Sequence, residues 1–267
     1  MTAPASPRVD ILGVKVSAID LGDAVRTIGD WIARRQRRYV CITGVHGVME
    51  CRRDPALRRI HNEAGLVTPD GMPLVWMARR LGFGRVRRVY GPDLMREVSR
   101  LSPQYGYRHF YFGGAPGLAE RLRDVLCQTY PGLCVAGILS PPFRAVTQAE
   151  DDAMIDAINA ARPDIVWVGL STPKQERWMQ AHRHLIEAPV LIGVGAAFDF
   201  LAGTKPQAPR WMQRGGLEWL FRLASEPRRL GGRYLRIVPG FLILAATQLL
   251  QRAPSKGLPA PQGTRTD

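Results

Sequence analysis

The segment Thr68-Pro69-Asp70-Gly71-Met72-Pro73-Leu74-Val75-Trp76 places one carboxylate on a sharp turn between a strand and a helix. The apolar run Gly65-Leu66-Val67 predicts the strand, and Pro73 predicts the start of the helix, because a first-turn N–H has no helical partner anyway. A carboxylate at the carboxyl end of a strand is well placed to take a proton from a substrate, so Asp70 is a candidate general base. The same pattern is also typical of a carboxylate that only caps the helix or closes an Asx turn.

Apolar strand patterns alternate with helical patterns along the chain. Strands are expected over residues 39–43, 107–112, 133–138, 164–169 and 189–194, and helices over 54–63, 116–129 and 149–160. This alternation predicts an α/β fold, with a Rossmann-like, mostly parallel sheet and helices on both of its faces. Ligands bind at the carboxyl ends of the strands in such sheets, so the residues that follow each strand are the candidate site.

The expected strand ends are rich in glycine, which lets backbone N–H groups approach a phosphate closely. These turns are Thr43-Gly44, Asp70-Gly71, Gly113-Gly114, Gly169–Glu176 and Gly193–Gly195. Within Gly169–Glu176, a helix expected from Pro173 has its partially positive amino end beside Lys174 and Gln175, an arrangement that suits a diphosphate. The alternative for Lys174 is a solvated surface charge.

The run Gly193-Val194-Gly195-Ala196-Ala197-Phe198 begins like a dinucleotide fingerprint. Phe198 stands where the third small residue belongs, and no acidic ribose partner follows at the expected distance, so a nicotinamide-dependent enzyme is a weak alternative. Asp199 comes next, and it either hydrogen-bonds a ribose or base or caps a turn.

The chain of 267 residues carries a net charge of +14, which implies anionic partners. Nine basic residues oppose two acidic ones between Lys205 and Arg252, and aromatic residues are interleaved with them. This pattern is typical of a helix that lies in a membrane interface, or of a surface helix with a solvated basic face. The run Ile237–Leu250 is expected to be too short, and too interrupted at Pro239 and Gly240, to cross a bilayer.

These observations predict an α/β catalytic domain at residues 1–203, a basic amphipathic helical appendage at 204–252 and a disordered tail at 253–267. The four cysteines form no CxxC pair and no zinc-like spacing, and no DxD triplet is present. We therefore expect a reducing cytosol, no bound metal and no cofactor. Cys41, inside an apolar strand, is expected to be a buried free thiol.

Six blocks in order make the chain resemble the bacterial WecG/TagA/CpsF glycosyltransferases, the N-acetylmannosaminyltransferase family (glycosyltransferase family 26), over about residues 10–236. The blocks are Asp70-Gly71, Arg88–Leu94, Phe112–Gly114, Gly169–Glu176, Gly193–Asp199 and Gly216–Leu223. The resemblance implies inverting transfer of a sugar from a nucleotide-diphosphate donor, such as UDP-N-acetylmannosamine, to a polyprenyl-diphosphate-linked acceptor in cell-surface polysaccharide synthesis. It also implies a cytoplasmic enzyme that is peripheral at the inner face of the cell membrane.

The resemblance assigns the general base to Asp70. Polar contacts to the substrates are expected from Thr43, Arg88, Gln175 and Asp199, with Gly113, Gly114, Lys174 and Gly195 added from the strand ends. Appendage arginines, with Arg222, Arg229 and Arg233 as candidates, are expected to close over the diphosphate, and the appendage resembles the family's membrane-targeting segment. One departure is Val45, where the family often has Asn, followed here by His46.

Two questions stay open at this point. The first is whether the chain forms a homo-oligomer. The second is raised by the net charge of +14, which also fits an anionic-polymer or nucleic-acid binding protein with a Rossmann-like core. No RNA-binding aromatic motif is present, so we expect no nucleic-acid partner.

Overall fold

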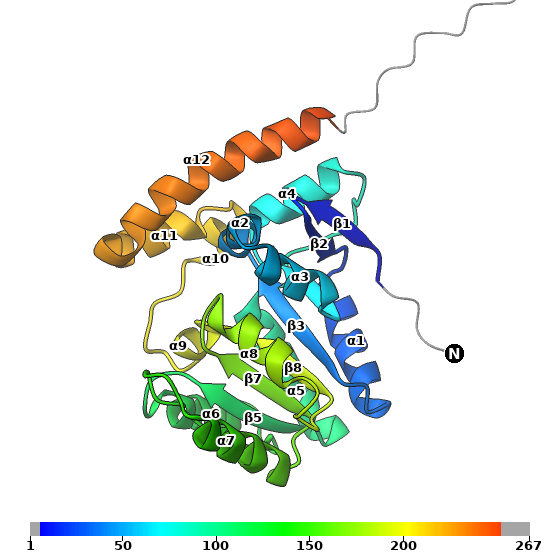
Figure 1. Ribbon diagram of the computed structural model, residues 1–267, viewed down its shortest axis with the longest axis vertical. Helices are drawn as coiled ribbons and strands as arrows, with labels where there is room; N and C mark the ends of the chain where they lie inside the picture. The colour runs from blue at the N-terminus through cyan, green and yellow to red at the C-terminus, as the bar shows by residue number, and fades with distance from the viewer. Residues whose placement is uncertain (1–5, 252–267) are drawn as a thin grey trace, which may run out of the picture.

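A six-stranded parallel sheet forms the centre of the molecule (Figure 1). The computed structural model describes residues 6–251, apart from the side chains of Arg229 and Arg233, and the expected disordered tail at 253–267 lies outside this range. The strand order is β4-β3-β8-β7-β5-β6. The strands are β3 (Arg38–Thr43), β4 (Leu66–Pro69), β5 (Arg108–Gly113), β6 (Cys134–Leu139), β7 (Ile165–Gly169) and β8 (Val190–Gly193). The predicted Rossmann-like α/β fold is confirmed.

Helices cover both faces of this sheet, because successive strand residues point to opposite sides and both sides are apolar. Tyr111 packs in the core on one face, and its neighbours Phe110 and Phe112 pack in the core on the other. The face of Tyr111 is covered by α1 (Leu21–Ala33), α5 (Gly91–Tyr105), α6 (Leu118–Thr129) and α9 (Ala197–Leu201). The opposite face is covered by α2 (Val45–Arg53), α3 (Pro55–Glu63), α4 (Met72–Arg80), α7 (Gln148–Ala160) and α8 (Lys174–His182).

An antiparallel hairpin precedes the sheet and was not among the expected strands. It consists of β1 (Arg8–Ile11) and β2 (Val14–Ser17), joined through Leu12 and Gly13. Both joining residues have positive φ, as a two-residue hairpin turn requires. The backbone N–H of Val67 in β4 donates to the Ser17 hydroxyl (3.0 Å), which fixes the hairpin against the sheet.

Three helices follow the α/β core: α10 (Arg210–Arg214), α11 (Glu218–Ser225) and α12 (Pro227–Gln251). The expected interruption at Pro239 and Gly240 is wrong, because α12 runs through both residues. Ile237 and Phe241, on either side of Pro239, are buried, and this packing holds the helix across the missing backbone donor. The stretch Leu230–Gln251, with mean hydropathy 1.3, is long and apolar enough to cross a membrane by length and composition alone, which also corrects the expectation.

Helix α12 has two apolar faces. The inner face packs against α2 and α4 (Figure 1) and consists of Ile237, Phe241 and Ala245. The outer face carries Leu235, Leu242, Ile243 and Leu250, whose exposed fractions range from 61% to 78%. Near the end of the helix, the Gln248 amide donates to the carbonyl of Asp10 (2.8 Å) and accepts from the N–H of Leu12 (3.0 Å). The helix is therefore fixed to the outer edge of β1.

A buried histidine in β5 is held neutral by its partners. Trp167 Nε1 donates to His109 Nδ1 (2.9 Å), so Nε2 carries the proton and donates to the Ser102 hydroxyl (2.6 Å). Burial lowers the pKa of His109 to about 3. Between about pH 6.5 and 3, the histidine is protonated in the unfolded chain but stays neutral in the folded chain. His109 therefore destabilises the fold as the pH falls through this range.

We expect His109 to make the free energy of unfolding of wild type fall by about 2 kcal/mol more between pH 6.5 and 5 than that of a variant without this histidine. Urea unfolding at the two pH values measures this change. His109→Gln should remove most of the difference, whereas the exposed His184→Gln should keep it. An equal pH dependence in wild type and His109→Gln would contradict the assignment.

Candidate active site

The carboxyl ends of the six strands lie along one rim of the sheet, because all of the strands are parallel. Thr43 at the end of β3 lies opposite Pro69 of β4, and Gly113 at the end of β5 lies opposite Gly169 of β7. From Asp70 to Gly113 the rim crosses four strand spacings, roughly 19 Å. The turns singled out from the sequence therefore share one edge of the molecule, long enough for an extended nucleotide sugar.

Asp70 is fixed to this rim by its backbone. Its N–H donates to the carbonyl of Thr43 (3.0 Å), and its own carbonyl accepts from Arg88 Nε. The residue that caps α4 is Gly71, and no side chain makes a capping hydrogen bond there. The helix-cap alternative for Asp70 is therefore not what the structure shows. The carboxylate turns toward Arg88 instead, with Arg88 Nη2 lying 3.4 Å from Asp70 Oδ1.

The Asp70 carboxyl is poised to exchange a proton near neutral pH. Burial raises its pKa to about 6, opposed by the charge of Arg88, reinforced by that of Glu218 and opposed again by that of Arg222. About 30% of the side chain remains exposed, so a substrate can reach it. A raised pKa together with an accessible carboxylate is the combination that a general base requires.

Arg88 connects the core to the appendage. Its Nη2 donates to Glu218 Oε2 of α11 (2.5 Å), and its Nη1 donates to Gln213 Oε1 of α10 (3.1 Å). The guanidinium also lies over the ring of Tyr90, 4.0 Å from the centroid. The sequence reasoning missed Glu218 and Gln213 as site residues. The available signal was that Glu218 is one of only two acidic residues in the basic stretch and lies in the Gly216–Leu223 block.

Arg222 also faces the site from α11. Its guanidinium lies 5.1 Å from the centroid of the Phe200 ring, and its charge acts on both Asp70 and Glu218. The structure therefore brings one of the three expected appendage arginines to the rim. The backbones of Arg229 and Arg233 belong to α12, but their side chains lie outside the described part of the chain.

Several expected contact residues hold the rim together. Gln175 is buried, and its Oε1 accepts from the N–H of Gly195 (3.0 Å) while its Nε2 donates to Glu176 (3.0 Å). This amide therefore joins the first turn of α8 to the loop after β8. The Thr43 hydroxyl is also buried and donates to the backbone carbonyl of Cys41 (3.3 Å). The Cys41 side chain is a buried free thiol, as predicted.

Two charged candidates lie farther along the rim. Lys174 begins α8 and is exposed. Asp199 in α9 forms an ion pair with Lys205 (3.4 Å), and its backbone carbonyl accepts from the N–H of Thr204 (3.0 Å). Both residues keep their assignments to the nucleotide as predictions.

The glycines after β5 serve a close backbone approach. Gly113 has φ of 116°, and a Cβ placed there would lie 2.8 Å from the carbonyl of Gly169. Gly114, with φ of 82°, donates its N–H to the same carbonyl (3.2 Å). A side chain at Gly113 would force β5 and β7 apart at the rim, and one at Gly114 would collide with Leu118 of α6.

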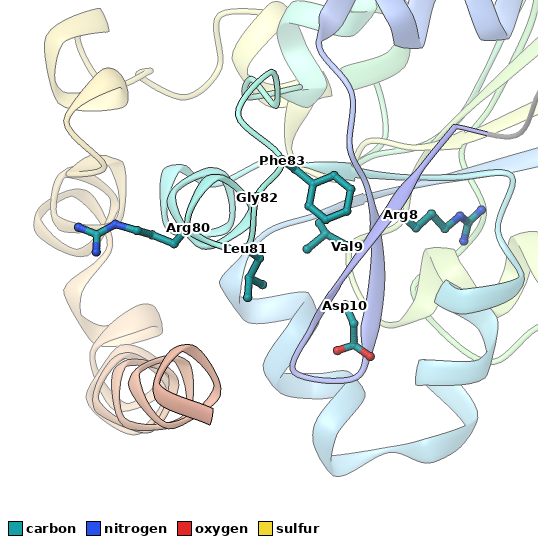
Figure 2. Close-up of a pocket in the computed structure, with 7 residues that line it drawn as sticks. All are labelled: Arg8, Val9, Asp10, Arg80, Leu81, Gly82 and Phe83. Atoms are coloured by element: carbon teal, nitrogen blue, oxygen red, sulfur yellow. The ribbon is translucent and has the colours of Figure 1, made fainter. Parts of the chain in front are cut away.

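Among the described residues, no group of three or more His, Cys, Asp or Glu side chains could hold a metal ion. A surface pocket lies elsewhere, between β1 and the turn after α4, and is lined by residues 8–10 and 80–83 (Figure 2). Its apolar side chains, Val9, Leu81 and Phe83, gather between the two segments, and Arg80 points away from the hairpin. This pocket lies at the opposite end of α4 from Asp70, a helix length of roughly 12 Å.

A parallel α/β sheet with an accessible carboxylate of raised pKa at its rim, and an arginine-bearing appendage beside that carboxylate, is a framework suited to group transfer from a phosphorylated donor. Residues 9–255 match the model of the Glycosyl transferase WecG/TagA/CpsF family, so the chain belongs to this family and is a glycosyltransferase. It is similar to the N-acetylglucosaminyldiphosphoundecaprenol N-acetyl-beta-D-mannosaminyltransferases of Staphylococcus aureus strains MW2 and NCTC 8325. Each is 27% identical over 237 residues, which cover 88% of this chain and 91% of the relative.

We expect Gly113→Ala to destabilise the protein by about 2–5 kcal/mol, because it adds both an unfavourable φ and a clash with the Gly169 backbone. Gly117→Ala is the matched control, since Gly117 has φ of 79° but open space around its Cβ. It should lose only about 1–2 kcal/mol in urea unfolding. Equal losses in the two variants would show that the close approach to Gly169 contributes nothing.

Proposed function

We propose that this protein is an inverting glycosyltransferase that moves a sugar from a nucleotide-diphosphate donor to a polyprenyl-diphosphate-linked acceptor in cell-surface polysaccharide synthesis. The observation that carries the proposal is the accessible Asp70 carboxylate, with its raised pKa, at the rim of the sheet. The names of the S. aureus relatives supply the substrate class, an N-acetylmannosaminyl group transferred to N-acetylglucosaminyldiphosphoundecaprenol.

In the proposed reaction, Asp70 takes the proton from an acceptor sugar hydroxyl while that oxygen attacks the anomeric carbon of the donor. The new glycosidic bond forms as the bond from the anomeric carbon to the diphosphate oxygen breaks. The electron pair leaves with the nucleoside diphosphate, and attack from the opposite face inverts the anomeric centre. One carboxylate suffices for this displacement, because the diphosphate leaves without prior protonation.

Protein cations and a helix end are suited to stabilise the departing diphosphate. Arg222 faces the site from the appendage, and α8 directs its partially positive amino end toward the same rim. Preorganised groups of this kind contribute on the order of 3 kcal/mol each to the transition state. We assign the sugar to the β3–β4 end of the rim, beside Asp70, and the nucleotide to the glycine turns after β5, β7 and β8.

We propose a UDP-sugar related to UDP-N-acetylmannosamine as the donor. Val45, the first residue of α2, directly follows Gly44, and a Cβ on Gly44 would lie 3.8 Å from Asp70 Oδ2. An apolar side chain at this position supplies no hydrogen bond to an acetamido group. A screen of UDP-sugars for release of UDP in the presence of a polyprenyl-diphosphate acceptor identifies the sugar.

We propose that the outer face of α12 lies on an anionic membrane surface, with the enzyme peripheral at its cytoplasmic side. Exposed apolar residues on this face, together with Trp211 of α10, which is 66% exposed, provide the apolar contact. Appendage arginines provide attraction to anionic lipid. This placement brings the rim of the sheet to the surface where a polyprenyl-linked acceptor resides.

We expect Asp70→Asn to lower turnover by at least about a hundredfold, since the amide cannot accept the acceptor proton. Nucleotide-sugar binding, measured by calorimetry, should stay near wild type. In the wild-type enzyme, kcat/KM should fall below about pH 6, because protonated Asp70 is inactive as a base.

Asp152→Asn, at an exposed position on α7, is the control and should retain normal turnover. Near-normal turnover of Asp70→Asn would remove Asp70 from its role as the base. Absence of UDP release from every UDP-sugar by the wild-type protein would overturn the proposed donor class.

Membrane association is tested on the outer face of α12. We expect Leu242→Glu combined with Ile243→Glu to reduce flotation with phosphatidylglycerol-containing vesicles by at least about tenfold, because two apolar side chains lose their contact with lipid. Leu185→Glu places a similar charge at an exposed leucine before β8 and should float like wild type. Unchanged flotation of the α12 variant would show that this face is not the contact.

A further inference from the structure

One guanidinium at the rim is shared by two carboxylates from different parts of the chain. Arg88 follows α4 in the core, Asp70 follows β4, and Glu218 begins α11 in the appendage. The Arg88 side chain is only 15% exposed and that of Glu218 only 16%, so water does little to screen this contact. A weakly screened ion pair of this kind shifts the pKa values of neighbouring ionisable groups.

The two carboxylates do not share Arg88 equally. Arg88 Nη2 lies 2.5 Å from Glu218 Oε2 but 3.4 Å from Asp70 Oδ1. The short contact is a charge-assisted hydrogen bond, whereas the longer one is at the limit of such a bond. Glu218 therefore holds Nη2 of the guanidinium, while Nε donates to the backbone carbonyl of Asp70 and Nη1 to Gln213, so the Asp70 carboxylate retains lone pairs that are not committed to Arg88.

We propose that Glu218 is a positioning residue for the transfer reaction: it draws Arg88 away from the Asp70 carboxylate and so leaves Asp70 free to accept the acceptor proton. This inference rests on the proposed role of Asp70 as the general base. Because Glu218 belongs to the appendage, the core receives a competent base only when α11 is seated over the rim. Seating of the appendage and activation of the base thus become one event.

The other charged and titratable groups around this contact support the same arrangement. Arg222, one helical turn after Glu218 on α11, places a second positive charge near both carboxylates. The Tyr90 ring supports the flat side of the Arg88 guanidinium, and burial raises the pKa of the Tyr90 hydroxyl beyond the working range, so it stays neutral. Gln213 accepts from Arg88 Nη1 and holds the guanidinium on the appendage side.

Removing the charge of Glu218 should lower the pKa of Asp70 for two reasons. A neighbouring negative charge is lost, and Arg88 becomes available to pair with Asp70 alone. A shift of about one pH unit is typical of the loss of one close charge. The base then becomes weaker and is held by the guanidinium, so the rate at its pH plateau should also fall.

The test compares wild type with Glu218→Gln, Glu218→Asp and Glu187→Gln. Carbon-13 NMR titration of the Asp70 carboxyl in the full-length protein, without substrate, reports its pKa directly. We expect Glu218→Gln to lower that pKa, and the acid limb of kcat/KM, by about one unit, with kcat reduced about tenfold and the donor KM changed less than about twofold. Glu218→Asp keeps the charge and should titrate closer to wild type. Glu187→Gln removes one exposed charge before β8 and should change nothing.

An unchanged Asp70 titration in Glu218→Gln overturns the proposal, even if its activity falls, because a merely structural role would lower activity without moving the pKa. If Glu218→Gln does not fold, Glu218→Asp decides, since drawing the carboxylate back by one methylene should lower the Asp70 pKa by a smaller amount, and no shift overturns the proposal. A third outcome separates the two proposals. If wild type transfers no sugar but the Asp70 pKa is still lower in Glu218→Gln than in wild type, the proposed function is contradicted while the Glu218–Arg88–Asp70 linkage stands.

Discussion

The contact between Arg88 and Glu218 is the constraint on which the arrangement of this site depends. It joins residues 130 positions apart and fixes α11 over the end of β4. A guanidinium this buried is tolerated only when its donors are satisfied, and here a backbone carbonyl, an amide and two carboxylates surround it. Loss of the appendage partners would leave Arg88 to Asp70 alone. The core and the appendage therefore form one electrostatic unit.

The strand ends combine scaffolding with chemistry. The Gln175 amide hydrogen-bonds to Gly195 and Glu176, and the missing side chain of Gly113 leaves space for the Gly169 backbone. Both residues therefore shape the rim without a ligand. Asp70 is different, because its raised pKa means that the folded state disfavours its ionised form. Such a carboxylate costs stability at neutral pH, on the order of 3 kcal/mol, which is typical of a group retained for chemistry.

Local patterns predicted most of the fold. The parallel strands and the helices between them follow from apolar runs and helical spacing, and Asp70 followed from one strand–turn–helix segment. The β1–β2 hairpin was not predicted from the sequence, because its strands are only four residues long and its turn carries Leu12 at positive φ, where glycine or asparagine is the usual signal. Continuity of α12 through Pro239 depends on tertiary packing. Glu218 and Gln213 could not be assigned to the site because only folding brings α10 and α11 to Arg88.

The amide of Gln248 has a wider consequence for the molecule. This amide hydrogen-bonds to the carbonyl of Asp10 and the N–H of Leu12, as the backbone of a neighbouring strand would, and so pairs part of the outer edge of the hairpin. Unpaired strand edges invite chains to join one another into aggregates. A shortened chain that ends before the last helix would uncover both this edge and the apolar surface of α2 and α4. The terminal helix thus protects the solubility of the fold on one side while it presents leucines on the other.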